Sequence, residues 1–313
     1  EPLHTRLTRW STYLHTSNFC PLITEVLTLE LPKYTSSTVD LPPTFPPSLA
    51  AIIFECLLIL CSSGPLFTAA VDGTLSRGFL ASEDLRTSHE HMTQKARLGQ
   101  PHIYAHFLVS PHGIPPSPTH LLAIRDVLQT YLSQTADANA LAHAIDNISA
   151  TSTPFPPVLS AAGLRKYLRT EHNVNSLTRI ESLYKLCSGL TRVHNATAPE
   201  ERDIPSRYPI SECGYALDAI RRIQQHRGRR GSNYVMNLVE DVCRYLHRNS
   251  PDFPEYRMRP WIIYSIFRAQ QAGVAEMLCS GLLGVWVEEG GGVNHYPAGL
   301  SVRSAWLVEP EEW

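Results

Sequence analysis

Histidines gather in one short part of this 313-residue chain, where five of the 14 lie between positions 89 and 112. His102 and His106 are four residues apart, so on a helix their rings would share one face and could bind one metal ion. On a strand the two rings would not be placed to bind the same ion. His89 and His91 are further candidate ligands. One hypothesis is therefore a metal-dependent enzyme or a metal-stabilised fold. The alternative is a set of ordinary surface or hydrogen-bonded histidines, with no cofactor.

The second candidate is the basic segment RRIQQHRGRR, residues 221–230. Glycines beside arginines let the backbone approach an anion closely. A helix that begins near Ser232 would direct its N-terminal amides at a phosphate, and Tyr234 could stack on a base. The segment thus predicts a nucleic-acid or phosphate site made of Arg221, Arg222, Arg227, Arg229, Arg230 and Tyr234. The alternative is a solvated basic turn that pairs with acidic residues of this chain or of a partner.

Recognised catalytic motifs are missing from the sequence. There is no G-x-S-x-G turn, no P-loop and no H-E-x-x-H. Ser182 and Lys185 fit S-x-x-K, but the companion motifs of that enzyme class do not accompany them. These absences favour a non-catalytic protein, although an active site can assemble from residues that are distant in the sequence.

Composition limits the remaining choices. The 27 Lys and Arg nearly balance the 29 Asp and Glu, for a net charge of −2, so no overall field attracts nucleic acid or an acidic membrane. The charged fraction is only 18%, which favours a surface partly covered by other protein subunits. Hydrophobic residues make up 43% of the chain, enough for a sizeable core.

The cysteines and the apolar segments bear on the compartment. Seven scattered cysteines with no C-x-x-C do not form a disulfide framework, so we expect a reducing, intracellular compartment, cytoplasm or nucleus. The first 30 residues lack the pattern of a secretory signal. The longest apolar run, 49–61, is too short to span a bilayer and predicts a buried helix.

The elements that must position these residues are predicted to be mainly helical. Apolar residues recur with a period near 3.6 between proline-rich breaks, which indicates helices. The expected helices are 5–15, 20–30, 49–62, 119–133, 137–148, 158–170, 176–190, 212–226, 232–248 and 260–283. Residues 284–289 and 300–308 flank a glycine run and predict a C-terminal β-hairpin. The predicted fold is a set of packed antiparallel helices, either an irregular bundle or a divergent solenoid.

Two parts are expected, a proline-broken helical part at 1–150 and a denser helical core with the hairpin at 151–313, which could form one continuous domain. The leading functional hypothesis is a non-catalytic scaffold subunit of an intracellular multiprotein complex. Three tryptophans are its candidate protein-interface residues, because Trp anchors interfaces well: Trp286, Trp306 and Trp313. The nucleic-acid site and the metal enzyme are the alternatives.

Overall fold

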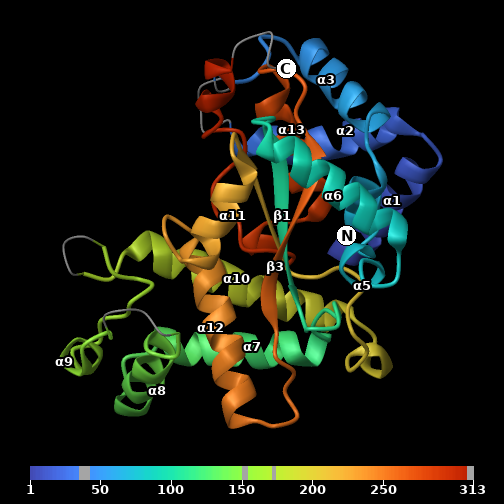
Figure 1. Ribbon diagram of the computed structural model, residues 1–313. Coiled ribbons are helices and arrows are strands. Elements are labelled where there is room, and N and C mark those ends of the chain that lie inside the picture. The colour runs from blue at the N-terminus through green and yellow to red at the C-terminus, as the bar shows by residue number, and fades with distance from the viewer. Residues whose placement is uncertain (35–42, 150–153, 171–173, 309–313) are drawn as a thin grey trace.

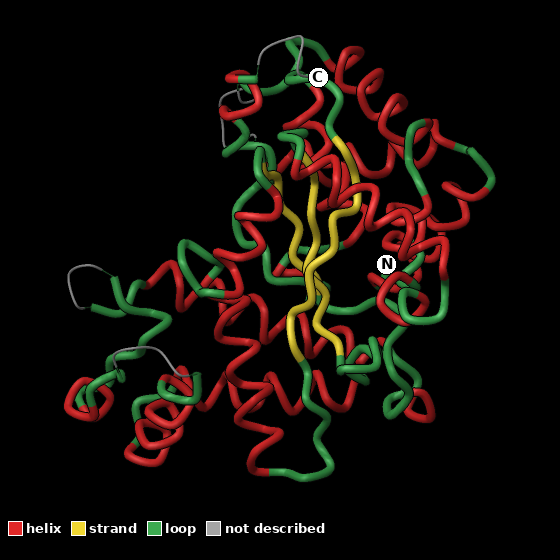
Figure 2. The backbone as a smooth tube through the Cα atoms, viewed as in Figure 1, coloured by secondary structure: helices red, strands yellow, loops and turns green. Residues whose placement is uncertain are grey.

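A three-stranded antiparallel sheet lies at the centre of the computed structural model, which describes residues 1–34, 43–149, 154–170 and 174–308 (Figures 1 and 2). The strand order is β2-β1-β3. The strands are β1 (His102–Val109), β2 (Ser211–Ala216) and β3 (Arg257–Ser265). Helices surround the sheet, so the prediction of a mainly α protein is confirmed.

The helices fall into three groups along the chain. Before β1 lie α1 (Leu3–His15), α2 (Phe19–Glu30), the 3-10 helix η1 (Leu31–Lys33), α3 (Leu49–Cys61), α4 (Pro65–Val71), α5 (Leu75–Gly78) and α6 (Glu83–Arg97). Between β1 and β2 lie α7 (Pro118–Leu132), α8 (Ala136–Asp146), α9 (Pro157–Ala161), α10 (Leu177–Ala196) and η2 (Pro199–Glu201). After β2 come α11 (Ala219–Arg227), α12 (Tyr234–Asn249), α13 (Gln271–Leu283), η3 (Val287–Glu289) and η4 (Arg303–Leu307), with β3 between α12 and α13.

Side-chain caps set where many of these helices begin. At the start of five helices a hydroxyl accepts a hydrogen bond from the backbone N–H three residues further on. Such a cap satisfies an amide that has no partner within the helix. The capping residues are Ser48, Ser82, Ser117, Thr135 and Ser176.

Strand β1 is buried along its whole length because helices cover both faces of the sheet. Alternate residues point to opposite faces of a strand. Ile103, Ala105 and Phe107 pack into the largest apolar cluster, together with α1 to α4 and α13. On the other face, Tyr104 packs against α6 and α11, and Leu108 against α7, α10 and α12. The central strand therefore divides two cores, and its polar residues are also held inside.

The longest apolar run forms α3, which buries one face in the core and exposes the other. Ile52, Cys56 and Ile59 are fully buried, whereas Phe54 is exposed. Within the described ranges no single helix has both the length and the apolar character needed to cross a membrane. Helices α3 and α4 meet that requirement only as a pair, and the chain bends by 107° between them.

Several predicted elements are wrong or not confirmed. Residues 212–226 begin with β2 before α11, and residues 260–283 begin with β3 before α13. The range 158–170 contains only the short α9. The C-terminal hairpin is not confirmed, because 284–289 and 300–308 hold the 3-10 helices η3 and η4. Neither is the bundle or solenoid, since the helices pack around a sheet.

The sheet also joins the two predicted parts of the chain. Strand β1 precedes residue 150, and both strands that pair with it follow that residue. Each part therefore supplies strands to the same sheet. The division at residue 150 stays a prediction.

Candidate active site

A cavity of about 350 Å³ lies at the free edge of β2. Helix α11 borders one side, Glu276 of α13 another, and the segment 294–301 a third. That segment is tied to the strand by Asn294, whose side chain accepts a hydrogen bond from Cys213 N–H and donates one to its carbonyl. Polar and aromatic side chains line the cavity, including Tyr104, Glu212, Arg222, His226 and Glu276.

The pairing of β1 with β2 places His106 directly opposite Glu212 on the same face of the sheet. His106 Nδ1 lies 2.7 Å from Glu212 Oε2, and both side chains are buried. Burial is the largest single influence on the pKa of Glu212 and raises it, and the hydrogen bond from His106 lowers it. Together with the Arg222 guanidinium and the neighbouring imidazole rings, that hydrogen bond outweighs burial, so the pKa of Glu212 lies below its usual value. Glu212 is therefore an ionised carboxylate in the cavity.

A second hydrogen-bonded group lies beside this pair. The Tyr104 hydroxyl is 3.0 Å from Nε2 of His226 and accepts a weaker hydrogen bond from Arg222 Nε at 3.4 Å. Burial lowers the pKa of His226 to about 4, so its ring is neutral at pH 7. If Tyr104 donates to Nε2, the ring proton lies on Nδ1, which is buried and has no hydrogen-bond partner among the described residues. Gly214 faces Tyr104, and a Cβ there would lie 2.6 Å from its hydroxyl oxygen.

Glu276 brings a second carboxyl group to the same cavity from α13. Its Oε2 accepts a hydrogen bond from the Gly299 N–H at 2.8 Å. Burial raises the pKa of Glu276 to about 7, and the negative charge of Glu212 acts in the same direction. The backbone hydrogen bonds from Gly299 and Tyr215, and the charge of Arg222, offset part of this shift. This carboxyl group therefore keeps its proton to a higher pH than an ordinary glutamate.

The cavity therefore contains two carboxyl groups whose environments move their pKa values in opposite directions. Glu212 is ionised and can accept a proton, whereas Glu276 is able to donate one. Two titratable groups separated in this way are the usual arrangement for an acid and a base that act on one substrate. The arrangement can thus support general acid–base chemistry.

Aromatic rings form the outer wall of the cavity. The rings of Tyr234 and His295 are 4.7 Å apart, and those of His295 and Tyr296 are 4.4 Å apart. The guanidinium of Arg179 lies 4.8 Å from the Tyr234 ring centre, on the side of α10. Tyr296 is 63% exposed at the rim. Such a wall offers flat apolar surfaces to a ring-containing ligand.

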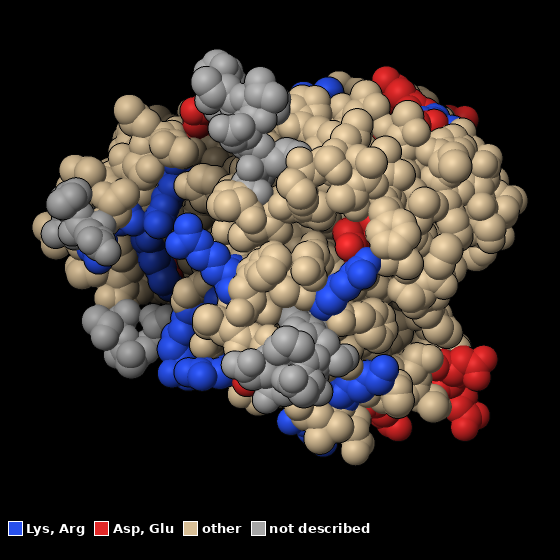
Figure 3. Space-filling view, turned by 90° about the horizontal axis from the view of Figure 1, so that it is seen from above, with Lys and Arg blue, Asp and Glu red and all other residues tan. Residues whose placement is uncertain are grey.

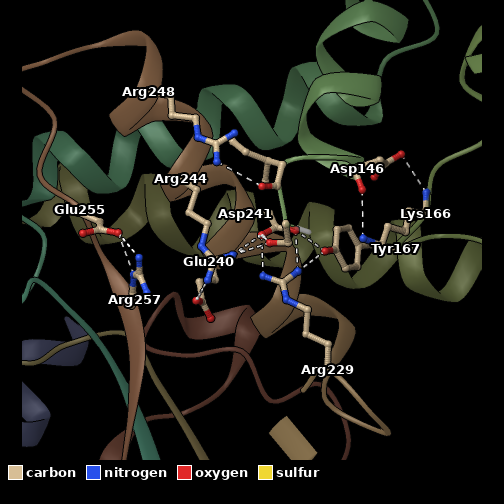
Figure 4. A network of polar contacts seen from close by, with 12 residues as sticks. Asp146, Lys166, Tyr167, Arg229, Glu240, Asp241, Arg244, Arg248, Glu255 and Arg257 are labelled. Carbon is tan, nitrogen blue, oxygen red and sulfur yellow. Dashed lines mark hydrogen bonds and ion pairs between the residues drawn. The ribbon is translucent and has the colours of Figure 1, made fainter. Parts of the chain in front are cut away.

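The arginine-rich segment is divided between three environments. Arg222 and Tyr234 line the cavity. Arg229 instead pairs with buried Asp241 and contacts Tyr167 (Figure 4). The other three members of the segment are exposed: Arg221, Arg227 and Arg230. Figure 3 shows Lys and Arg side chains gathered along a hollow in the face seen from above.

The predicted phosphate site at a helix N-terminus is not formed as expected. Helix α12 begins at Tyr234, and its cap is Asn233 rather than Ser232. The Asn233 side chain accepts hydrogen bonds from the N–H groups of Val235 and Met236. Two of the amides that a phosphate would use are therefore already occupied.

The four candidate metal ligands do not converge. His89 and His91 lie on α6, whereas His102 and His106 lie on β1, a strand and not the helix that the metal hypothesis required. His106 pairs with Glu212, and both ring nitrogens of His102 are buried without a hydrogen-bond partner in the described part of the chain. Within the described residues, no group of three or more His, Cys, Asp or Glu side chains is arranged to hold a metal ion.

The three tryptophans proposed for a protein interface also differ. Trp286 is buried, and its Nε1 donates to Glu30 at 2.9 Å, so it belongs to the core and not to a surface. Trp306 is 51% exposed. Trp313 lies outside the described residues.

Sequence reasoning did not identify Glu212, Glu276 or His226 as lining one site. No local motif marks the two glutamates, which are far apart in the sequence and meet only through the sheet and α13. The sequence feature that could have pointed to His226 is its position inside the arginine-rich segment.

Comparison with known proteins assigns no family. No family model, no curated protein and no solved structure matches this chain. The residues of the cavity are therefore the basis for a functional conclusion.

Proposed function

We propose that this protein is an enzyme that carries out general acid–base chemistry on a small polar substrate in the cavity beside β2. One observation carries the proposal. Two carboxyl groups share one cavity, and their surroundings lower the pKa of Glu212 and raise that of Glu276 to about 7. A purely structural role does not require two carboxyl groups in one cavity to have pKa values shifted in opposite directions.

Each residue then has a distinct role. Glu212 is the general base and removes a proton from water or from a substrate hydroxyl. Glu276 is the general acid and protonates the leaving group. His106 is a positioning residue, because its hydrogen bond holds Glu212 ionised and fixed in direction. Arg222 lies in the same cavity and stabilises negative charge that develops on the substrate. The reaction class is hydrolysis or group transfer.

The test uses a panel of 4-nitrophenyl glycosides, esters and phosphates with the wild-type protein, Glu212→Gln and Glu276→Gln. Glu181→Gln is the matched control, because Glu181 is exposed on α10 and paired only with Lys185. Loss of a general acid or base costs roughly 10²- to 10⁴-fold in rate. We expect both cavity variants to lose at least about 100-fold in kcat, and the control to keep full activity. Equal turnover by all four proteins, or none from the wild type on any substrate, contradicts the proposal.

A second candidate function is nucleic-acid binding through Arg221, Arg227 and Arg230. The supporting observation is that all three side chains are exposed and that none forms an ion pair within the described residues. Replacing the three by Gln should reduce the affinity for RNA and the slope of that affinity against salt concentration. Unchanged affinity and slope would rule out this surface.

The role of scaffold subunit in an intracellular complex stays a prediction. Affinity purification from source cells, with and without nuclease, is its direct test. A stoichiometric protein partner that resists nuclease supports the scaffold role, and a chain recovered alone counts against it.

A further inference from the structure

A second cavity, of about 410 Å³, lies beside β3, at the other edge of the sheet from the candidate active site. It is bounded by α4, α6 and the outer edge of β3. Most of its walls are apolar, with Leu66, Met92, Ile263 and Phe267 among the lining residues. Its size is in the range of small-molecule sites, which are about 300–1,000 Å³.

One unpaired cation lies in this apolar cavity. Lys95 of α6 lines it, and its Nζ is 5.8 Å from the centre of the Phe267 ring. No carboxylate in the described part of the chain forms an ion pair with Lys95. A half-buried ammonium group that has no counter-charge favours an anion from outside. The cavity thus combines an apolar interior with one positive charge.

The neighbouring polar groups do not supply a competing negative charge. The Tyr264 hydroxyl is 2.9 Å from the Ser62 hydroxyl, so each satisfies the other. His102 is near Lys95, and burial lowers its pKa to about 4, with the Lys95 charge acting in the same direction. His91, the remaining titratable residue of the lining, is exposed and cannot be negative.

We propose that this cavity binds an apolar carboxylic acid, with the hydrocarbon part between α4, α6 and β3 and the carboxylate on Lys95. The charge decides between this ligand class and a neutral lipid or alcohol, since of these only the acid brings a negative charge to the ammonium group. The proposal does not depend on the candidate active site, because the two cavities have no lining residue in common.

The first experiment compares decanoate with decan-1-ol as probes, by calorimetry on the full chain. A hydrogen bond to a charged group is worth about 1.5–3 kcal/mol, which is tenfold or more in affinity. Lys95→Met should weaken decanoate binding at least about tenfold and leave decan-1-ol within about twofold. Lys185→Met is the matched control, because Lys185 is exposed on α10 and should change neither.

The second experiment closes the cavity without damaging the fold. Gly64 lines it, has an extended backbone with φ of −98°, and a Cβ there would meet no atom within 4 Å. Gly64→Leu should therefore abolish binding of both probes while the melting temperature stays unchanged. Decanoate that binds Lys95→Met as tightly as wild type overturns the role of the charge. Decanoate binding that survives Gly64→Leu, or is absent from the wild type, overturns the site.

Discussion

Replacing Arg229 by Met tests the most consequential reassignment in the structure, from an anion-binding residue to a partner of a buried carboxylate. Asp241 of α12 is completely buried. Its Oδ1 and Oδ2 each lie 2.6 Å from a terminal nitrogen of Arg229, and the Ser149 and Tyr167 hydroxyls also donate to it. Methionine keeps most of the apolar stem of the side chain and removes its charge.

The expected cost follows from the burial of Asp241. Removing one partner of a buried ion pair costs about 3–5 kcal/mol, because the remaining charge loses its compensation. Arg244 stays 3.7 Å from Oδ1 of Asp241, so the lower end of that range applies, about 3 kcal/mol. The entropy of unfolding is about 2.1 cal/mol/K per residue, or about 0.66 kcal/mol/K for this chain. The melting temperature should therefore fall by about 5 °C.

The assay is thermal unfolding followed by circular dichroism, with Arg230→Met as the control, because Arg230 is exposed and follows Arg229 directly. The nucleic-acid hypothesis drawn from the sequence predicts the opposite, that both arginines serve binding and neither serves stability. A melting temperature for Arg229→Met within about 1 °C of wild type would refute the structural assignment. So would an equal loss in the Arg230→Met variant.

Three further predictions concern stability and reactivity. Because the pKa of Glu276 is raised, the folded state binds the proton of this carboxyl group more tightly than the unfolded state does. The stability that this proton contributes is present below pH 4.5 and is lost as pH rises to about 7. Between pH 4 and pH 8, the free energy of unfolding measured with urea should fall by about 3 kcal/mol more in the wild type than in Glu276→Gln. A difference between the two proteins that does not change with pH argues against the raised pKa. Gly189→Ala should lower the free energy of unfolding by at least about 2 kcal/mol, since the new Cβ would lie 2.4 Å from the backbone nitrogen of Gly290, and an unchanged urea midpoint contradicts that contact. Titration with a thiol reagent should find two fast cysteines, exposed Cys20 and Cys61, and a third fast thiol disagrees with the burial of the other five.

The helices that the sequence predicted correctly are those with a continuous apolar stripe and a local start. Residues 119–132 are an example, because the stripe of α7 is buried and Ser117 caps it. The strands were missed for a physical reason. A short apolar run that is buried on both sides does not reveal its period, so residues 261–264 suit a buried helix as well as β3. Pro260 lies in β3, an edge strand, and edge strands tolerate proline.

The candidate site was only partly accessible to sequence reasoning. Arg222 and Tyr234 line the cavity, and His106 lies beneath it, but they had been assigned to two separate hypotheses. What unites them is the register of β1 against β2, which puts His106 opposite Glu212. Register depends on the whole sheet and its cores, and no spacing within either segment encodes it. Glu276 lies on α13, so its position in the cavity also depends on tertiary packing.

The most direct test of the acid–base account is the pKa of each of the two carboxyl groups. Protein labelled with ¹³C at the glutamate side-chain carboxyl carbon is titrated by NMR, and Glu212→Gln and Glu276→Gln assign the two signals. The account predicts a signal with a pKa near 7 that disappears only in Glu276→Gln, and a signal below 4.5 that disappears only in Glu212→Gln. Two carboxyl groups that both titrate near the ordinary glutamate value would contradict it.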